Sequence, residues 1–221
     1  MLRAALAMVI AATCGLTEGQ TSIRYEFEVA VIENTFADNA VPGAIAGIPL
    51  NTAGSFSIEV DSIVPPISDG TAAAYSVLGF DLSIAGFDAG EDSAFYPSSD
   101  VVSSFNIVDN VPLRDPLPAD SVAAFLRWDN AEIGLSTFFI GQEVEIGEEP
   151  TLFTSFDLPR EVDLSLANVQ RSIVIQSKGP GASGNFGRFE LQFTSVDVVL
   201  IPAPSAAATL MVGVLALGRR R

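Results

Sequence analysis

The sequence has no histidine and a single cysteine, Cys14, close to the N-terminus. Without these side chains, a Ser-His-Asp triad, a Cys-His pair and a histidine-ligated metal site are all excluded. A disulfide within the chain is excluded as well, because it needs a second cysteine. Lysine is almost absent too, with Lys178 as its one representative. Any catalytic chemistry would therefore depend on carboxylates or hydroxyls, and we predict that the chain is not an enzyme.

Basic residues are scarce: 11 Lys and Arg stand against 27 Asp and Glu, which gives a net charge of -16. Arg3 and Glu18 cancel at one end and Arg219–Arg221 add +3 at the other, so the region between them carries about -19. A field of that sign repels nucleic-acid phosphates and anionic lipid headgroups. We therefore expect no nucleic-acid partner, and cations or cationic polymers are the favoured counterparts.

The N-terminus has the layout of a secretory signal peptide over residues 1–19. A basic start at Met1–Arg3 precedes an apolar run at 4–12, and small or polar residues follow through Thr21. This order predicts export and cleavage after Gly19. An alternative interpretation takes residues 11–14 as a lipobox, which would make Cys14 the lipidated first residue of the mature chain.

The C-terminus, residues 201–221, has three parts. Pro202-Ala203-Pro204 precede an apolar run at 205–218, and three arginines close the sequence. Fourteen residues would make a helix of about 21 Å, short of the roughly 30 Å hydrocarbon core. We therefore expect a short hydrophobic helix that inserts only transiently into the inner membrane, with the arginines on the cytoplasmic side.

This layout resembles the PEP-CTERM sorting signal of Gram-negative and related bacteria, in which a Pro-Glu-Pro motif precedes a hydrophobic helix and an arginine cluster. Pro202 and Pro204 match the two prolines, Ala203 stands where the motif has glutamate, and the cluster is Arg219, Arg220 and Arg221. The resemblance implies an exosortase as the processing partner, beside the secretion machinery, and a place at the cell surface or in the extracellular matrix. A plain C-terminal membrane anchor is the alternative.

Residues 20–200, between these ends, alternate apolar and polar side chains as β-strands do. In 23–32, Ile23, Tyr25, Phe27, Val29 and Val31 alternate with Arg24, Glu26, Glu28, Ala30 and Ile32. In 53–63, Phe56, Ile58 and Val60 alternate with Ser57, Glu59 and Asp61. Further strands are predicted at 74–84, 101–108, 122–128, 133–140, 152–156, 171–177 and 186–200. Residues 120–129 also fit a short helix, and we favour a strand there.

Short strands separated by turn clusters predict one all-β domain, an antiparallel, jelly-roll-like β-sandwich. The first strand, with Tyr25-Glu26-Phe27, and the strand from Gly54-Ser55-Phe56 to Asp61 also resemble the ectodomains common among PEP-CTERM proteins. That resemblance implies the same fold and adds no chemistry.

Calcium is the metal that this composition favours, because it takes carboxylate and carbonyl oxygens and needs neither His nor Cys. Asp88, Glu91 and Asp92 fall within a five-residue, Gly-containing loop and could supply three ligands. A solvated acidic turn is the alternative. A second acidic loop contains Asp109, Asn110, Asp115 and Asp120. No other cofactor is expected.

Two further patterns bear on carbohydrates. A glycosidase-like carboxylate pair could be drawn from Glu143, Glu145, Glu148 and Glu149, and a sugar-stacking platform from Trp128, Phe125, Phe138 and Phe139. We predict instead an exported cell-surface or extracellular-matrix protein with a structural or adhesive role, for which extracellular polysaccharide is a candidate partner. The alternatives are a carbohydrate-binding or polysaccharide-active module and a calcium-stabilised envelope domain.

Overall fold

The computed structural model describes residues 20–36, 44–62, 67–68, 72–91, 104–111, 113, 116–129, 133–177 and 187–202. Within them the chain forms β-strands and one short 3-10 helix, η2 (Ala44–Gly47). The strands are β1 (Gln20–Asn34), β2 (Ala53–Asp61), β3 (Ile67–Ser68), β4 (Ala72–Ile84), β5 (Phe87–Gly90), β6 (Ser104–Val108), β7 (Ala119–Arg127), β8 (Ile133–Glu143), β9 (Gln170–Ser177) and β10 (Arg188–Pro202). For these residues, the prediction of an all-β domain is confirmed.

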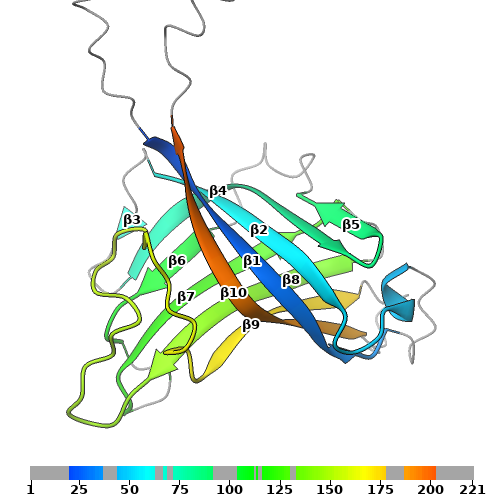
Figure 1. Cartoon of the computed structure of the whole chain (residues 1–221). Helices are drawn as coiled ribbons and strands as arrows, with labels where there is room; N and C mark the ends of the chain where they lie inside the picture. Colours follow the sequence, from blue (N-terminus) through cyan, green and yellow to red (C-terminus); the bar gives the residue numbers. More distant parts are fainter. Residues whose placement is uncertain are drawn as a thin grey trace, which may run out of the picture.

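Eight of these strands close into an antiparallel barrel (Figure 1). Their order around the wall is β2-β1-β10-β9-β8-β7-β6-β4, and β4 pairs back onto β2. The predicted sandwich is therefore wrong. The reason lies in β4, which pairs with β6 along 72–76 and with β2 along 77–84. One long strand thus joins both halves of the sheet, and no second sheet is left to pack against it.

The inner face of the wall carries the apolar members of the alternation. Rings from β1, β2, β6, β8 and β10 contact one another in the centre, where Phe27 lies with its ring centroid 4.4 Å from Phe193 and 5.5 Å from Phe138. Trp128 meets Phe80 edge to face at 4.9 Å. Because these rings are almost fully buried and contact one another, the centre of the barrel is filled by side chains.

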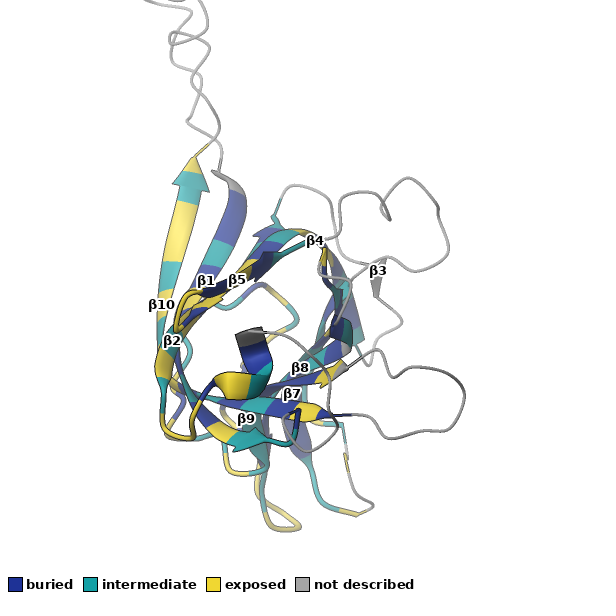
Figure 2. Cartoon of the chain, turned by 90° about the vertical axis from the view of Figure 1, so that its right-hand side faces the viewer, coloured by how far each residue is buried: buried dark blue, intermediate teal, exposed yellow. Residues whose placement is uncertain are grey.

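The loop 144–169 between β8 and β9 packs against one end of the barrel. Its apolar residues Leu152, Phe153, Leu158 and Leu164 are buried, and its backbone accepts hydrogen bonds from two barrel tyrosines. At the opposite end η2 lies across the barrel mouth in Figure 2, and Ile45 within it and Ile48 directly after it are buried. Asn34 fixes this turn, because its Nδ2 donates to the carbonyl oxygens of both isoleucines at 2.9 and 2.8 Å.

Most predicted strands are present, and 120–129 is a strand as favoured, since β7 covers it to Arg127. Residues 152–156 are not a strand. The N–H groups of Thr151 and Leu152 are bound by the Gln142 side chain and that of Phe153 by Asp120, so side chains replace a neighbouring strand here. The sequence interpretation also missed β3 and β5, which pair with opposite edges of β4 outside the closed ring.

The predicted signal peptide, 1–19, lies outside the described residues. Of the predicted sorting signal, 201–221, the structure describes only Ile201 and Pro202, which end β10, and the expected C-terminal helix lies outside the described residues. Among the residues that the structure describes, no helix is long and apolar enough to cross a membrane. The strands begin at Gln20 and end at Pro202, close to the predicted domain limits of 20 and 200.

Candidate functional site: an acidic groove on the barrel wall

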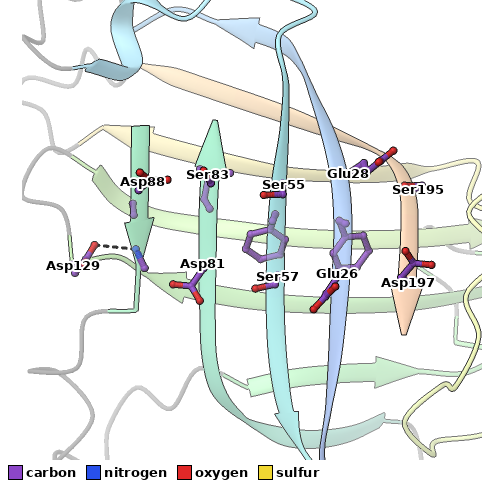
Figure 3. A pocket seen from close by; sticks show the side chains of 15 residues that line it. Glu26, Glu28, Ser55, Ser57, Asp81, Ser83, Asp88, Asp129, Ser195 and Asp197 are labelled. Carbon is purple, nitrogen blue, oxygen red and sulfur yellow. Dashed lines mark hydrogen bonds between the residues drawn. The ribbon is translucent and has the colours of Figure 1, made fainter. Parts of the chain in front are cut away.

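A groove of about 680 Å³ lies on the outer wall, across β10, β1, β2, β4 and β5 (Figure 3). Outward-facing residues of these five strands supply its polar lining, together with Asp129, which follows β7. The alternation that fills the core sends every second side chain of a strand outward. Six of the lining residues carry carboxylates and four carry hydroxyls: Glu26, Glu28, Asp81, Asp88, Asp129, Asp197, Ser55, Ser57, Ser83 and Ser195. None of the residues lining it is basic.

The side chains form two rows that follow the strand register. The first row runs Ser195, Glu28, Ser55, Ser83, Asp88, in which each residue is the cross-strand partner of the next. The second row runs Asp197, Glu26, Ser57, Asp81, Gly90 in the same way. With strands about 4.8 Å apart and rows two residues apart, the polar surface measures about 19 Å by about 7 Å.

The second row contains two acidic neighbours. Glu26 of β1 and Asp197 of β10 are direct cross-strand partners, so two like charges face each other. Such a pair destabilises a sheet in the absence of a counter-charge. The fold nevertheless keeps both on the groove.

Gly90 and Asp129 end the second row. A Cβ atom on Gly90 would lie 2.9 Å from Asp81 Oδ1, so a larger residue there would displace that carboxylate from its present position. The Gly90 N–H donates to Asp129 Oδ1 at 3.1 Å, which holds Asp129 at the rim. Gly90, the cross-strand partner of Asp81, therefore leaves space for the carboxylate in this position.

Arg24, the basic residue next along β1, is already engaged. Its Nη2 lies 2.7 Å from Glu59 Oε2, and Ser22 Oγ donates to the other Glu59 oxygen at 2.6 Å. The hydrogen bond to Glu59 and the charges of Glu59, Glu26 and Asp81 raise the pKa of Arg24. Burial opposes ionisation of Glu59, but the hydrogen bonds from Ser22 and Arg24 outweigh it and lower the pKa of Glu59. Arg24 thus neutralises Glu59 and leaves the groove acidic.

The predicted calcium ligands are divided by the structure. Asp88 is exposed and lines the groove from β5. Glu91 is half-buried, and its Oε2 lies 3.4 Å from where a Cβ on Gly79 would be. Burial, with the charge of Asp81, raises the pKa of Glu91. Asp92 lies outside the described residues, and within those residues no three acidic side chains are grouped to hold a metal ion. Calcium at this loop stays a prediction.

The second acidic loop becomes a structural anchor. Asp120 is completely buried at the start of β7; its Oδ1 accepts from the Asn110 N–H at 2.9 Å and its Oδ2 from the Phe153 N–H at 3.0 Å. Burial, with the charge of Asp120 and a hydrogen bond to it, raises the pKa of Asp109. Asp115 lies outside the described residues. These groups tie two loops to the barrel end.

Three of the four candidate glutamates, Glu143, Glu145 and Glu148, line a second depression of about 560 Å³ beside Asn168. Glu149 is exposed outside it, and the Asn168 side chain pairs with the backbone N–H and carbonyl of Glu143. Lys178 lies outside the described residues.

The aromatic platform is not assembled. Trp128 and Phe138 are buried in the core, and Trp128 Nε1 donates to Ser136 Oγ, whereas Phe125 projects into solvent. Phe27 and Phe56, in the floor of the acidic groove, also have buried rings. A sugar ring in the groove would therefore meet carboxylates and hydroxyls and no exposed aromatic face.

No protein-family model, no curated protein and no solved structure matches this chain. Function therefore has to follow from the geometry of the chain itself. Of the predicted sorting residues, Pro202 is the exposed last residue of β10, while Ala203, Pro204 and Arg219–Arg221 lie outside the described residues.

The sequence interpretation did not find the groove. It identified Glu26, Glu28, Ser57 and Glu59 as the wet faces of two strands, which was correct. It could not bring them beside Asp81, Asp88 and Asp197, because strand order is set by pairings between segments as far apart as β1 and β10.

Proposed function

We propose that this chain is an exported cell-surface or extracellular-matrix protein with a structural or adhesive role, and that the acidic groove binds positively charged groups of matrix polymers. The proposal assigns no reaction to the groove. The signal-peptide-like N-terminus and the sorting-signal-like C-terminus support export. Because aromatic side chains fill the barrel, a ligand surface on the outside of the wall is favoured over one inside.

The observation that carries the proposal is the cross-strand pair Glu26 and Asp197. Four more carboxylates lie on the same groove, and no basic side chain lines it. Repulsion between the two facing carboxylates lowers the stability of the fold, and a bound cation would relieve that repulsion. The long, shallow shape of the two rows suits an extended polymer better than a compact small molecule. The serines between the carboxylates offer hydrogen bonds to hydroxyl or amine groups.

A chitosan oligomer, a cationic polysaccharide, tests the proposal by calorimetric titration of the full chain. We expect binding that weakens as salt is raised, because the attraction is between exposed charges. The fully acetylated, neutral oligomer should bind much more weakly. The groove variant Glu26→Gln, Glu28→Gln, Asp81→Asn, Asp197→Asn should lose most of the binding.

The matched control is Glu145→Gln, Glu148→Gln, Glu149→Gln, Glu161→Gln, which removes the same charge from exposed positions outside the groove. It should bind chitosan nearly as the wild-type chain does. Equal loss in both variants would mean that net charge alone attracts the polymer, and the proposed role of the groove would be wrong.

A further inference from the structure

The strand β10 is much longer than its neighbour on one side. It pairs with β1 as far as Pro202, but with β9 only along 188–192. In the described part of the chain, no strand pairs with that edge of β10 along residues 193–200. The overhang is visible in Figure 1, where β9 stops low on the barrel while β10 continues to its end.

The overhang exposes apolar side chains beside its unpaired backbone edge. Val199 and Leu200 are 40% and 45% exposed. Both are apolar, and valine is a residue type enriched in strands. Asp197 is exposed on the outer face, whereas Val196 and Val198 are partly buried against the core. Natural sheets usually protect such an edge with lysine, proline or a covering loop. Here Pro202 marks only its last residue.

The open edge continues the acidic groove. Asp197 begins the second row and Ser195 begins the first, so a strand added beside β10 would extend both rows by one position. The residue opposite Asp197 would lie about 10 Å from the Glu26 backbone, two strand spacings away, so the Glu26 charge would also act on it. That position favours lysine or arginine strongly over an acidic residue.

We propose that the free edge of β10 binds an extended segment of a partner polypeptide by strand addition, with a basic residue opposite Asp197 and apolar residues beside Val199. This inference goes beyond the proposed function of the groove, because it rests on the unpaired edge and on backbone hydrogen bonds. A second copy of the chain is a poor occupant. Two copies would bring their acidic β10 and β1 strands together, and each carries a net charge of -16.

The probe is a fluorescein-labelled peptide, Thr-Val-Val-Lys-Val-Val-Thr, blocked at both ends and titrated into the full chain by anisotropy; with its lysine opposite Asp197, a valine lies beside Val199 in either strand direction. We expect saturable binding. The same peptide with alternate amides N-methylated keeps its side chains and charges but loses backbone donors, and its affinity should fall by about tenfold or more. A peptide with glutamate in place of lysine should not bind measurably.

Two variants locate the site. Val199→Lys places a charge on the open edge and Asp197→Lys reverses the recognised one, so each should weaken peptide binding by about tenfold. The control is Phe125→Lys on β7, an exposed position on a strand with neighbours at both edges. It should leave the affinity unchanged.

Equal affinity for the N-methylated and parent peptides, or no binding of the parent peptide, would overturn the proposal. A dimer of the chain that Val199→Lys dissociates would overturn the choice of partner. Chitosan separates this result from the groove, since Val199→Lys should leave chitosan binding intact. If the wild-type chain does not bind chitosan but binds the peptide, the proposed function of the groove is wrong and the proposal for the edge of β10 stands.

Discussion

The hydroxyl of Tyr25 donates a hydrogen bond of 2.9 Å to the carbonyl oxygen of Pro159, 134 residues later in the chain. Tyr25 stands on β1 inside the barrel, and Pro159 belongs to the loop that covers one end. Tyr75 of β4 makes the matching contact to the Phe156 carbonyl at 2.8 Å. Burial raises the pKa of both tyrosines, so each stays protonated and able to donate.

Tyr25→Phe should loosen this loop. The change removes the donor and leaves the Pro159 carbonyl without it, which we expect to cost about 1 to 2 kcal/mol of unfolding free energy. Urea denaturation measures the loss, and limited trypsin digestion at the exposed Arg160 measures local opening. Tyr75→Phe should act in the same direction, and the double variant should be cut fastest. Unchanged cleavage in the double variant would show that apolar packing alone holds the loop.

Gly54→Ala should damage the barrel seam. A Cβ at this position of β2 would lie 2.7 Å from both Ile84 Cβ and the Ser83 carbonyl oxygen of β4, so the backbone itself must move. We expect a loss of about 2 kcal/mol or more, read from the melting temperature. The control is Gly47→Ala, where a Cβ would meet nothing within 4 Å. Similar small effects of the two changes would contradict the tight approach of β2 and β4.

Asp109→Asn should change how stability depends on pH. The folded chain raises the pKa of Asp109, so it holds this proton more tightly than the unfolded chain does. Asp109 therefore adds stability below its unfolded pKa, and the contribution is lost as pH rises through the folded pKa. Asparagine stays neutral, so the variant should melt higher than wild type at pH 7, with the gap closing below about pH 4.

Melting curves from pH 3 to pH 8 measure that gap. Glu161→Gln, which removes a charge at an exposed position, serves as the control and should show no comparable closing. A constant difference between Asp109→Asn and wild type at every pH would contradict the proton held beside Asp120.

The sequence predicted the inward and outward faces of β1 and β2 residue by residue, because a period of two is a local property. It did not predict closure, because sandwiches and barrels share that period. Closure depends on β4 changing partner from β6 to β2 along its length, which is a pairing between distant segments. The same limit hid the groove. The strand predicted at Leu152 and Phe153 was wrong for a different reason. Both residues are buried, as in a strand, but their N–H groups donate to the side chains of Gln142 and Asp120 and not to a neighbouring strand.

The predicted signal peptide and sorting signal can be tested by intact-mass analysis of the protein recovered from its host. The host is fractionated into medium, outer envelope and inner membrane. We expect a mature chain that has lost residues 1–19 and the tail near Pro204. A chain that still ends at Arg221 and is found in the inner membrane would instead indicate a plain anchor, as Ala203 in place of glutamate would then have prevented sorting.

The register between β1 and β10, which begins with Gln20 opposite Pro202, also determines how the barrel carries mechanical load. The hydrogen bonds between antiparallel strands lie across the strand direction. A pull on Pro202 against a partner held on β1, β2 and β4 would load all of these bonds together in shear. A pull between Gln20 and Pro202 would open them one pair at a time. The barrel should therefore resist force far better through a partner on its wall than through its own two ends.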